Sequence, residues 1–256
     1  MLNGKKIALG VTGGIAVYKA VDLVSRLRKQ GAEVRVIMTE HAQQFVTPLT
    51  FKEISGNKVA VSMWDSNQEF NVEHIALANW ADAFVVAPAT ANILAKMANG
   101  IADDLLSTTL LAAQAPIIVC PAMNTGMYQN SITQENIEKL QKHGVTVMPP
   151  AVGYLACGVT GPGRLPEPQQ IVEFIDAFFA KKDGDMVGMK VLVTAAGTRE
   201  PIDPVRFVGN RSSGKMGYAI AQAAAQRGAE VLLVTGPSAL EIPPNVNGVK
   251  VESTNE

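Results

Sequence analysis

The chain has 256 residues, of which 47% are hydrophobic and 18% charged, and its formal net charge is −1. This composition supplies enough apolar material for one large core or two ordinary ones, excludes wholesale disorder, and lacks the positive charge of a nucleic-acid-binding protein. No apolar run approaches the ~18 residues that span a bilayer, and the two cysteines fit neither a metal-ligand spacing nor a disulfide framework. We therefore expect a soluble, cytoplasmic protein without a metal-ligand cluster.

Residues 7–38 predict a βαβ unit: a strand over 7–11, an amphipathic helix over about 15–29 and a second strand over 33–38. The turn between the first strand and the helix reads Thr-Gly-Gly-Ile-Ala, and its free backbone amides suit a phosphate group. The spacing Gly10-x-x-Gly13-Gly14 is not the GxGxxG fingerprint, and no acidic residue closes the second strand. The turn therefore favours a mononucleotide over a dinucleotide.

The following segment continues the alternation of strands and helices, and polar residues follow the strand ends. Thr39 is expected to cap a helix, and His74 either caps a helix start or serves a site. Cys120 lies in an apolar run and is interpreted as core. We predict strands over 59–64, 83–87, 116–120 and 145–148, and helices over about 92–98, 103–114 and 134–143.

A glycine-rich stretch, residues 153–165, interrupts this alternation. It holds four glycines, a proline and an arginine around Cys157, whose neighbours Ala156 and Gly158 shield the thiol little. The stretch is too long for a simple connector and too rich in helix breakers for a helix, which favours a lid or clamp over a bound ligand. Its cysteine is either a proton donor or nucleophile, or an incidental residue of a structural turn.

The pattern restarts after an amphipathic helix over about 169–181 and a polar linker over 181–185. A strand over 190–194, a long polar loop over 199–217, a helix over about 216–227 and a strand over 230–235 form a second βαβ unit. Ser212-Ser213-Gly214-Lys215 could cradle a phosphate but does not match the P-loop order. Because two strands and one helix cannot cover both faces of a sheet, we expect this second domain to be incomplete.

Six motifs together resemble the bacterial bifunctional coenzyme A biosynthesis proteins, in which a phosphopantothenoylcysteine decarboxylase is fused to a phosphopantothenate–cysteine ligase. The likeness covers essentially the whole chain. The motifs are residues 10–16 (GVTGGIA), 73–75 (EHI), 88–92 (PATAN), 121–124 (PAMN), 155–165 (LACGVTGPGRL) and 210–217 (NRSSGKMG).

The resemblance implies an α/β fold: a flavodoxin-like doubly wound parallel sheet in residues 1–189, followed by the start of a second Rossmann-like α/β domain in residues 190–256. It implies FMN as the cofactor of the first domain, bound over the strand ends. It also implies a homo-oligomer, a trimer or a dodecamer, with FMN at the subunit contacts and His74 reaching across. The implied FMN-binding residues are Gly13, Gly14, Ile15, Thr39, Thr90, Asn92 and Ser107.

The same resemblance assigns the chemistry. The thiol of phosphopantothenoylcysteine would be oxidised to a thioaldehyde, loss of CO2 would give an enethiol, and reduction would give phosphopantetheine. Cys157 would donate the proton in the last step, Asn124 would hold the substrate carboxylate, and His74 would act as a base or position that carboxylate. Met123, Ala156 and Arg164 would complete the substrate site.

Residues 190–256 resemble the first part of the ligase domain, which activates phosphopantothenate with CTP and Mg²⁺ before cysteine is coupled. Because the family's later nucleotide contacts lie beyond residue 256, we expect no ligase activity from this chain. The implied nucleotide loop comprises Gly197, Asn210, Ser212, Ser213, Gly214 and Lys215.

Three alternative functions share parts of this pattern. A flavin-prenylating enzyme shares the fold but does not need a thiol on a clamp. A non-catalytic FMN-binding regulatory module could keep the flavin site while losing His74, Asn124 or Cys157, yet all three are present. A peptide-cysteine decarboxylase would share the chemistry but not residues 190–256.

Overall fold

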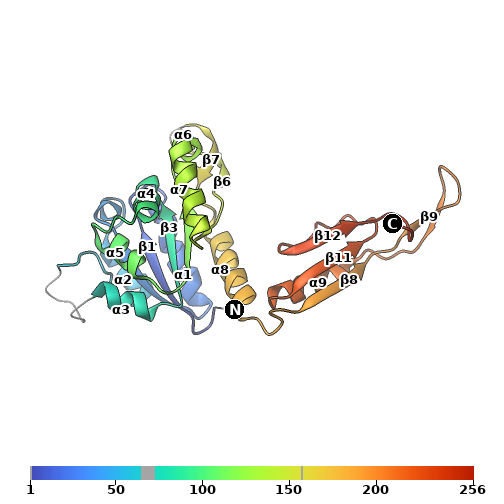
Figure 1. The fold of residues 1–256 in the computed structure, drawn as a ribbon, viewed down its shortest axis with the longest axis horizontal. Helices are drawn as coiled ribbons and strands as arrows, with labels where there is room; N and C mark the ends of the chain where they lie inside the picture. The colour runs from blue at the N-terminus through green and yellow to red at the C-terminus, as the bar shows by residue number, and fades with distance from the viewer. Residues whose placement is uncertain (1, 65–72, 157) are drawn as a thin grey trace. The chain divides into compact units, whose positions relative to one another are not determined.

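The computed structural model describes residues 2–64, 73–156 and 158–256. The described chain divides into two compact units, residues 2–174 and 175–256. Each unit is built on its own parallel sheet (Figure 1).

The first unit is organised around a five-stranded parallel sheet in the order β2-β1-β3-β4-β5. This is the strand order of a flavodoxin-like doubly wound fold, so the predicted fold class is confirmed. Every residue of β3 is buried, as expected for a parallel strand covered on both faces. The strands are β1 (Lys6–Val11), β2 (Glu33–Met38), β3 (Ala83–Ala89), β4 (Ile117–Pro121) and β5 (Thr146–Val147).

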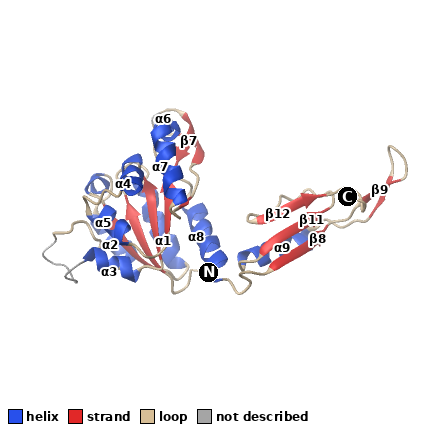
Figure 2. Ribbon diagram, viewed as in Figure 1, coloured by secondary structure: helices blue, strands red, loops and turns tan. Residues whose placement is uncertain are grey.

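Helices flank this sheet (Figure 2). On one face Phe84 packs in a cluster with Leu94 and Leu106. Leu9 alternates with the residues of that cluster along its strand, so it faces the other side of the sheet, where α1 contacts β2 and β3. The helices are α1 (Val17–Lys29), α2 (Pro48–Ser55), α3 (Glu73–Trp80), α4 (Ala91–Asn99), α5 (Leu105–Ala112), α6 (Thr125–Gln129), α7 (Ser131–Lys142) and α8 (Pro168–Asp183), with a 3-10 turn η1 (Glu40–Gln44).

The strand predicted over 59–64 is wrong. Ala60 makes one parallel bridge to Ile37, donating to the carbonyl of Val36 and accepting from Met38, and the chain then leaves the sheet edge. Trp64 is 87% exposed, so the apolar run is buried only at its start. Apolar composition alone could not reveal that the run meets the sheet at a single residue.

The glycine-rich stretch is not an irregular loop but a two-stranded antiparallel hairpin, β6 (Ala151–Tyr154) and β7 (Thr160–Arg164). Gly163 adopts φ +130°, and a Cβ there would collide with the carbonyl oxygen of Met123. Gly161 also lies close to its neighbour, because a Cβ at that position would be 2.7 Å from the hydroxyl oxygen of Thr125. The glycines therefore let β7 lie directly against the segment that leads from β4 into α6.

The second unit contains a three-stranded parallel sheet, in the order β12-β11-β8, against which the helix α9 packs. The prediction of only two strands is wrong. The edge strand β12 was not predicted because it contains Asn and Gly and lacks a strong strand pattern. The predicted loop over 199–217 likewise contains a short antiparallel pair, β9 and β10. The elements are β8 (Lys190–Ala195), β9 (Arg199–Pro201), β10 (Phe207–Gly209), α9 (Lys215–Gln226), β11 (Glu230–Thr235) and β12 (Val246–Lys250).

Candidate functional site

A cleft of about 1210 Å³ opens at the carboxyl ends of β1 and β3 in the first unit. These two strands are neighbours, and the sheet strand that follows each lies on its outer side: β2 beside β1, and β4 beside β3. Ligands of open α/β sheets bind at such a switch point. The cleft is lined by residues 12–16, 39–41, 88, 90–93, 122–124 and 154–156, with others from α1, α4, α6 and the hairpin.

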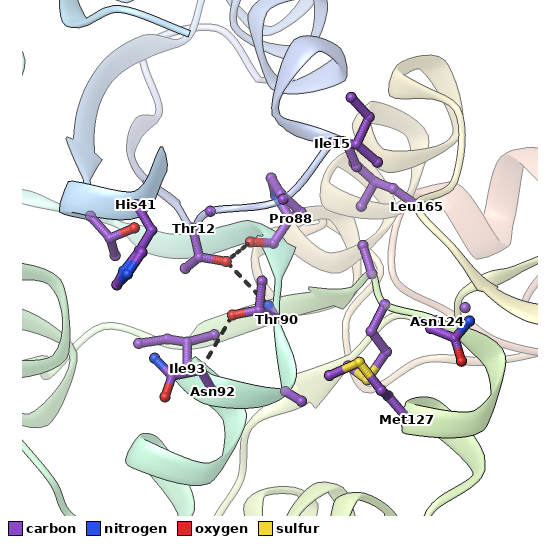
Figure 3. Close-up of a pocket in the computed structure, with 18 of the residues that line it drawn as sticks. Thr12, Ile15, His41, Pro88, Thr90, Asn92, Ile93, Asn124, Met127 and Leu165 are labelled. Carbon is purple, nitrogen blue, oxygen red and sulfur yellow. Dashed lines mark hydrogen bonds between the residues drawn. The ribbon is translucent and has the colours of Figure 1, made fainter. Parts of the chain in front are cut away.

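Thr12 ties the two central strands together at the floor of the cleft (Figure 3). Its hydroxyl donates to the carbonyl of Pro88 (2.7 Å) and accepts from the backbone N–H of Thr90 (3.2 Å). The Thr90 hydroxyl in turn accepts from the N–H of Ile93 and caps α4. Thr12 was not among the predicted site residues, although its place directly after a buried strand was a usable signal.

The predicted phosphate turn lies at one end of the cleft and leads into α1. Ala16, at the N-cap of α1, offers no side-chain cap, and no acidic residue lies in the first turn. The amides that begin a helix without such a cap suit an anion. A Cβ on Gly13 would be 2.5 Å from the Cβ of His41 and 2.8 Å from its carbonyl carbon, so glycine is required there. His41 also lines the cleft, and sequence reasoning missed it.

Thr39 and Asn92, two predicted cofactor residues, also line the cleft. The Thr39 hydroxyl accepts from the N–H of Ala42 (3.3 Å), which confirms the predicted cap. Ser107 does not line the cleft. It is buried, and its hydroxyl and amide form a capping box with Asp104 at the start of α5.

A charged cluster on the cleft wall was not predicted. The ammonium of Lys96 lies 2.6 Å from Asp103 and 2.8 Å from Asp104. Burial alone would lower the pKa of Lys96, but hydrogen bonds to the two carboxylates outweigh it and raise that pKa. Burial would raise the pKa of Asp104, but hydrogen bonds from Lys96 and Ser107 hold it below its ordinary value.

Asn124 is positioned by the helix that it starts. Its Oδ1 accepts from the N–H of Gly126 (2.8 Å) at the N-cap of α6, which turns the Nδ2 end of the amide the other way. Met123, which also lines the cleft, donates its N–H to the carbonyl of Gly163 (2.9 Å). Ala156 and Arg164 line the cleft from the hairpin, so four of the predicted substrate residues lie together.

The other two predicted catalytic residues are His74 and Cys157. His74, at the start of α3, is half-buried and does not line the cleft. Cys157 lies outside the described residues. Cys120 is fully buried, and burial raises the pKa of its thiol to about 12, which confirms its assignment to the core.

The predicted nucleotide loop of the second unit is brought together around an Asx turn. Asn210 Oδ1 accepts from the N–H of Ser212 (2.9 Å), and a Cβ on Gly197 would collide with the Asn210 amide. Gly214 is the N-cap of α9, with φ +79°. Ser238, which lines a neighbouring cavity of about 770 Å³, donates to the carbonyl of Ser213 (3.1 Å).

Comparison with known proteins places the first unit in a family. A family model described as Flavoprotein matches residues 1–180. The chain belongs to the flavoprotein family. A second model, described as the DNA/pantothenate metabolism flavoprotein C-terminal domain, matches residues 186–256.

The chain resembles the coenzyme A biosynthesis bifunctional protein CoaBC of several bacteria, which confirms the resemblance read from the motifs. It is 52% identical to that of Vibrio vulnificus over 255 residues, which is 100% of this chain and 63% of the relative. It is 50% identical to that of Bacillus subtilis over 244 residues, which is 95% of this chain and 60% of the relative. The chain thus spans less than two thirds of the length of these relatives.

Solved structures resemble the first unit. A PPC decarboxylase mutant complexed with pantothenoylaminoethenethiol is 32% identical, with a TM-score of 0.62 over 69% of this chain and 99% of that one. The FMN-binding protein AtHal3 is also 32% identical, with a TM-score of 0.60 over 69% of this chain and 97% of that one.

The described part of the chain lacks two kinds of feature. No helix there is long and apolar enough to cross a bilayer. Within the same residues, no three His, Cys, Asp or Glu side chains are grouped to hold a metal ion.

Proposed function

We propose that the first unit is an FMN-dependent decarboxylase that converts 4'-phosphopantothenoylcysteine to 4'-phosphopantetheine in coenzyme A biosynthesis. The observation that carries the proposal is the composition of the cleft wall. The glycine turn that suits a mononucleotide phosphate, the hairpin and Asn124 all line the same cleft. Membership of the flavoprotein family and the similarity to the bifunctional CoaBC proteins and to the PPC decarboxylase support it.

The residues around the cleft fit FMN. The uncapped start of α1, next to Gly13 and Gly14, would take the phosphate, and Thr39 would lie beside it. A Cβ on Gly14 would meet nothing nearer than 3.9 Å, so there is room for a ligand to approach that backbone. The cleft is also large enough for a flavin mononucleotide and a substrate together.

FMN, when bound, supplies the reversible two-electron oxidation that turns the thiol carbon into an electron sink for decarboxylation. The chain's own residues bind and protonate the substrate. The Nδ2 end of Asn124 would hold the carboxylate without neutralising it, and Arg164 would attract the anionic substrate. Cys157 would give its proton to the enethiol in the last step.

His74 is assigned to a neighbouring subunit's site, because it does not line the cleft of its own chain. In this assignment the protein is a homo-oligomer, a trimer or a dodecamer, with FMN at the subunit contacts. Several large apolar side chains at the mouth of the cleft support a covered surface there, since Ile15, Tyr18 and Tyr154 are each more than 60% exposed.

The second unit is assigned to the first part of a CTP- and Mg²⁺-dependent phosphopantothenate–cysteine ligase domain. The juxtaposition of Gly197, Asn210 and Ser212 at the start of α9 supports this assignment. A domain boundary after residue 189 remains a prediction, since the compact units divide at 174/175 and the family matches leave 181–185 uncovered.

The test is to incubate the purified protein with phosphopantothenoylcysteine and to read the product mass and the flavin absorbance. We expect a yellow protein and a product that has lost CO2 and has the mass of phosphopantetheine. A yellow protein that leaves the substrate intact would favour the FMN-binding regulatory module instead. Cys157→Ser should keep the flavin and still release CO2, but stop at the enethiol; parent-like turnover would remove the proton-donor role.

A further inference from the structure

Lys19 is a buried cation at the unfavourable end of a helix. It lies in the first turn of α1, and only 6% of the residue is exposed. A positive charge near a helix N-terminus opposes the helix dipole, and burying it costs further free energy unless it is paired. The other basic residues near the ends of α1 are placed where the dipole favours a positive charge, because Arg26, Arg28 and Lys29 all lie in its last turn.

The ammonium of Lys19 is compensated from a distant part of the sequence. It donates to the carbonyl of Leu165 (3.0 Å) and to Oε1 of Glu167 (3.0 Å). The hydrogen bond from Lys19 lowers the pKa of Glu167, which keeps the carboxylate charged. A cation that has two such partners is stabilised enough to remain buried against the dipole.

These partners lie at the exit of the hairpin. Leu165 directly follows β7 and is buried, and the residue before it, Arg164, donates to the same Glu167 (2.8 Å). On the other side of Arg164, the carbonyl of Gly163 accepts from Met123. The arginine is therefore held between two attachments of its strand, one to the β4–α6 segment and one to α1.

We propose that Lys19 is a positioning residue: through Leu165 and Glu167 it fixes β7 over the cleft and orients Arg164 toward an anionic substrate. The orientation of Arg164 toward a substrate rests on the proposed function, whereas the attachment of the hairpin to α1 does not. Lys19 itself lines the cleft, but both of its hydrogen bonds go to the hairpin exit rather than to the phosphate turn.

The experiment is hydrogen exchange on the full chain with FMN and without substrate, comparing Lys19→Met with Lys29→Met. Both variants remove one positive charge from α1, but Lys29 is exposed. In Lys19→Met we expect amides of β6 and β7 to exchange about tenfold faster, with β3 unchanged. FMN affinity should change by less than about threefold, and Lys29→Met should match the parent protein in both measurements.

Two further variants keep the test decisive. Glu167→Gln, at a half-exposed position, should loosen the hairpin in the same direction even if Lys19→Met does not fold. Lys19→Arg should restore part of the protection. With substrate, Lys19→Met and Glu167→Gln should raise KM more than they lower kcat.

Unchanged hairpin exchange in Lys19→Met and Glu167→Gln would overturn the proposal. So would a loss of FMN affinity with a protected hairpin, which would make Lys19 a cofactor ligand instead. If the parent protein neither binds FMN nor turns over, the proposed function fails while the exchange result still decides the attachment.

Discussion

Strands β3 and β8 both carry apolar runs, but their two sheets differ in how they are covered. Every residue of β3 in the first unit is buried, whereas burial alternates along β8 in the second, where Leu192 is 66% exposed. On the covered face Val193 packs with Tyr218 of α9. An apolar strand sequence therefore does not tell by itself whether one face or both faces of its sheet are covered.

The difference extends to the two glycine-rich turns. In the first unit the turn before α1 rests on a sheet packed on both faces, and Thr12 joins the neighbouring strands beneath it. In the second unit the loop before α9 is ordered by an exposed Asx turn at Asn210. A site on a doubly covered sheet is better preorganised, so the first unit should carry the chemistry of this chain.

The largest expected effect is a difference in decarboxylation rate between variants of two asparagines that make the same local hydrogen bond. Asn124→Asp and Asn210→Asp each keep an oxygen that accepts the N–H two residues on, so both variants should fold. Asn124→Asp should repel the substrate carboxylate and lower decarboxylation at least about 100-fold while FMN stays bound. Asn210→Asp should leave that rate unchanged; equal rates in the two variants would remove Asn124 from the site.

The next effect compares one leucine from each sheet by chemical unfolding. Leu9 is fully buried in β1, so Leu9→Ala should lower the free energy of unfolding of the first unit by about 2–5 kcal/mol. Leu192→Ala should change that of the second unit by less than about 0.5 kcal/mol, because its side chain is exposed. A large loss at Leu192 would mean that the open face is covered in solution.

Local patterns predicted much of this fold. Apolar periodicity located β1, α1 and β2, and the hydroxyl of Thr39 marked a helix cap that the structure contains. Helix α2 was missed although Pro48 at its start and Gly56 after its end were usable signals.

Long-range contacts were beyond local patterns. The attachment of Lys19 to Glu167 joins residues 148 positions apart, and the contact of Gly13 with His41 depends on how η1 lies on the turn. The predicted strand over 59–64 failed for the same reason, because its burial is decided by the sheet edge it meets. Motifs therefore located the cleft, while the side chains that hold its walls emerged only from the fold.

A smaller effect is expected when a methyl group is added to a glycine in each of the two glycine-rich turns. Gly13→Ala forces a collision with the Cβ and carbonyl carbon of His41, and should cost about 1–3 kcal/mol of stability and weaken FMN binding. The atoms nearest to a Cβ in Gly197→Ala belong to the exposed side chain of Asn210, which can rotate away at the loss of one exposed hydrogen bond from Ser212, so its cost should be about 1 kcal/mol or less. Thermal unfolding and flavin titration measure both; a costlier Gly197→Ala would reverse the order of rigidity between the two turns.

The smallest effect concerns acid stability and compares two carboxylates whose pKa values are lowered. Asp104 is paired with the largely buried Lys96, whereas Asp185 pairs with Arg227 at the surface. Because the folded pKa of Asp104 lies below its ordinary value of 3.8, its stabilisation is present above that value and is lost as pH falls through the folded pKa. The Lys96 contribution has the opposite sign: it is present below 10.5 and is lost as pH rises through a raised folded pKa.

Asp104→Asn should therefore lower the free energy of unfolding by about 1–2 kcal/mol at neutral pH, and the difference from the parent protein should vanish well below pH 3.8. Asp185→Asn should be indistinguishable from the parent across the same range, because water screens that exposed pair. Urea unfolding at a series of pH values measures both. A pH-independent loss in Asp104→Asn would show that the charge of Asp104 is not what stabilises the fold. A pH-dependent loss in Asp185→Asn would show that its ion pair with Arg227 is less exposed to solvent than the structure indicates.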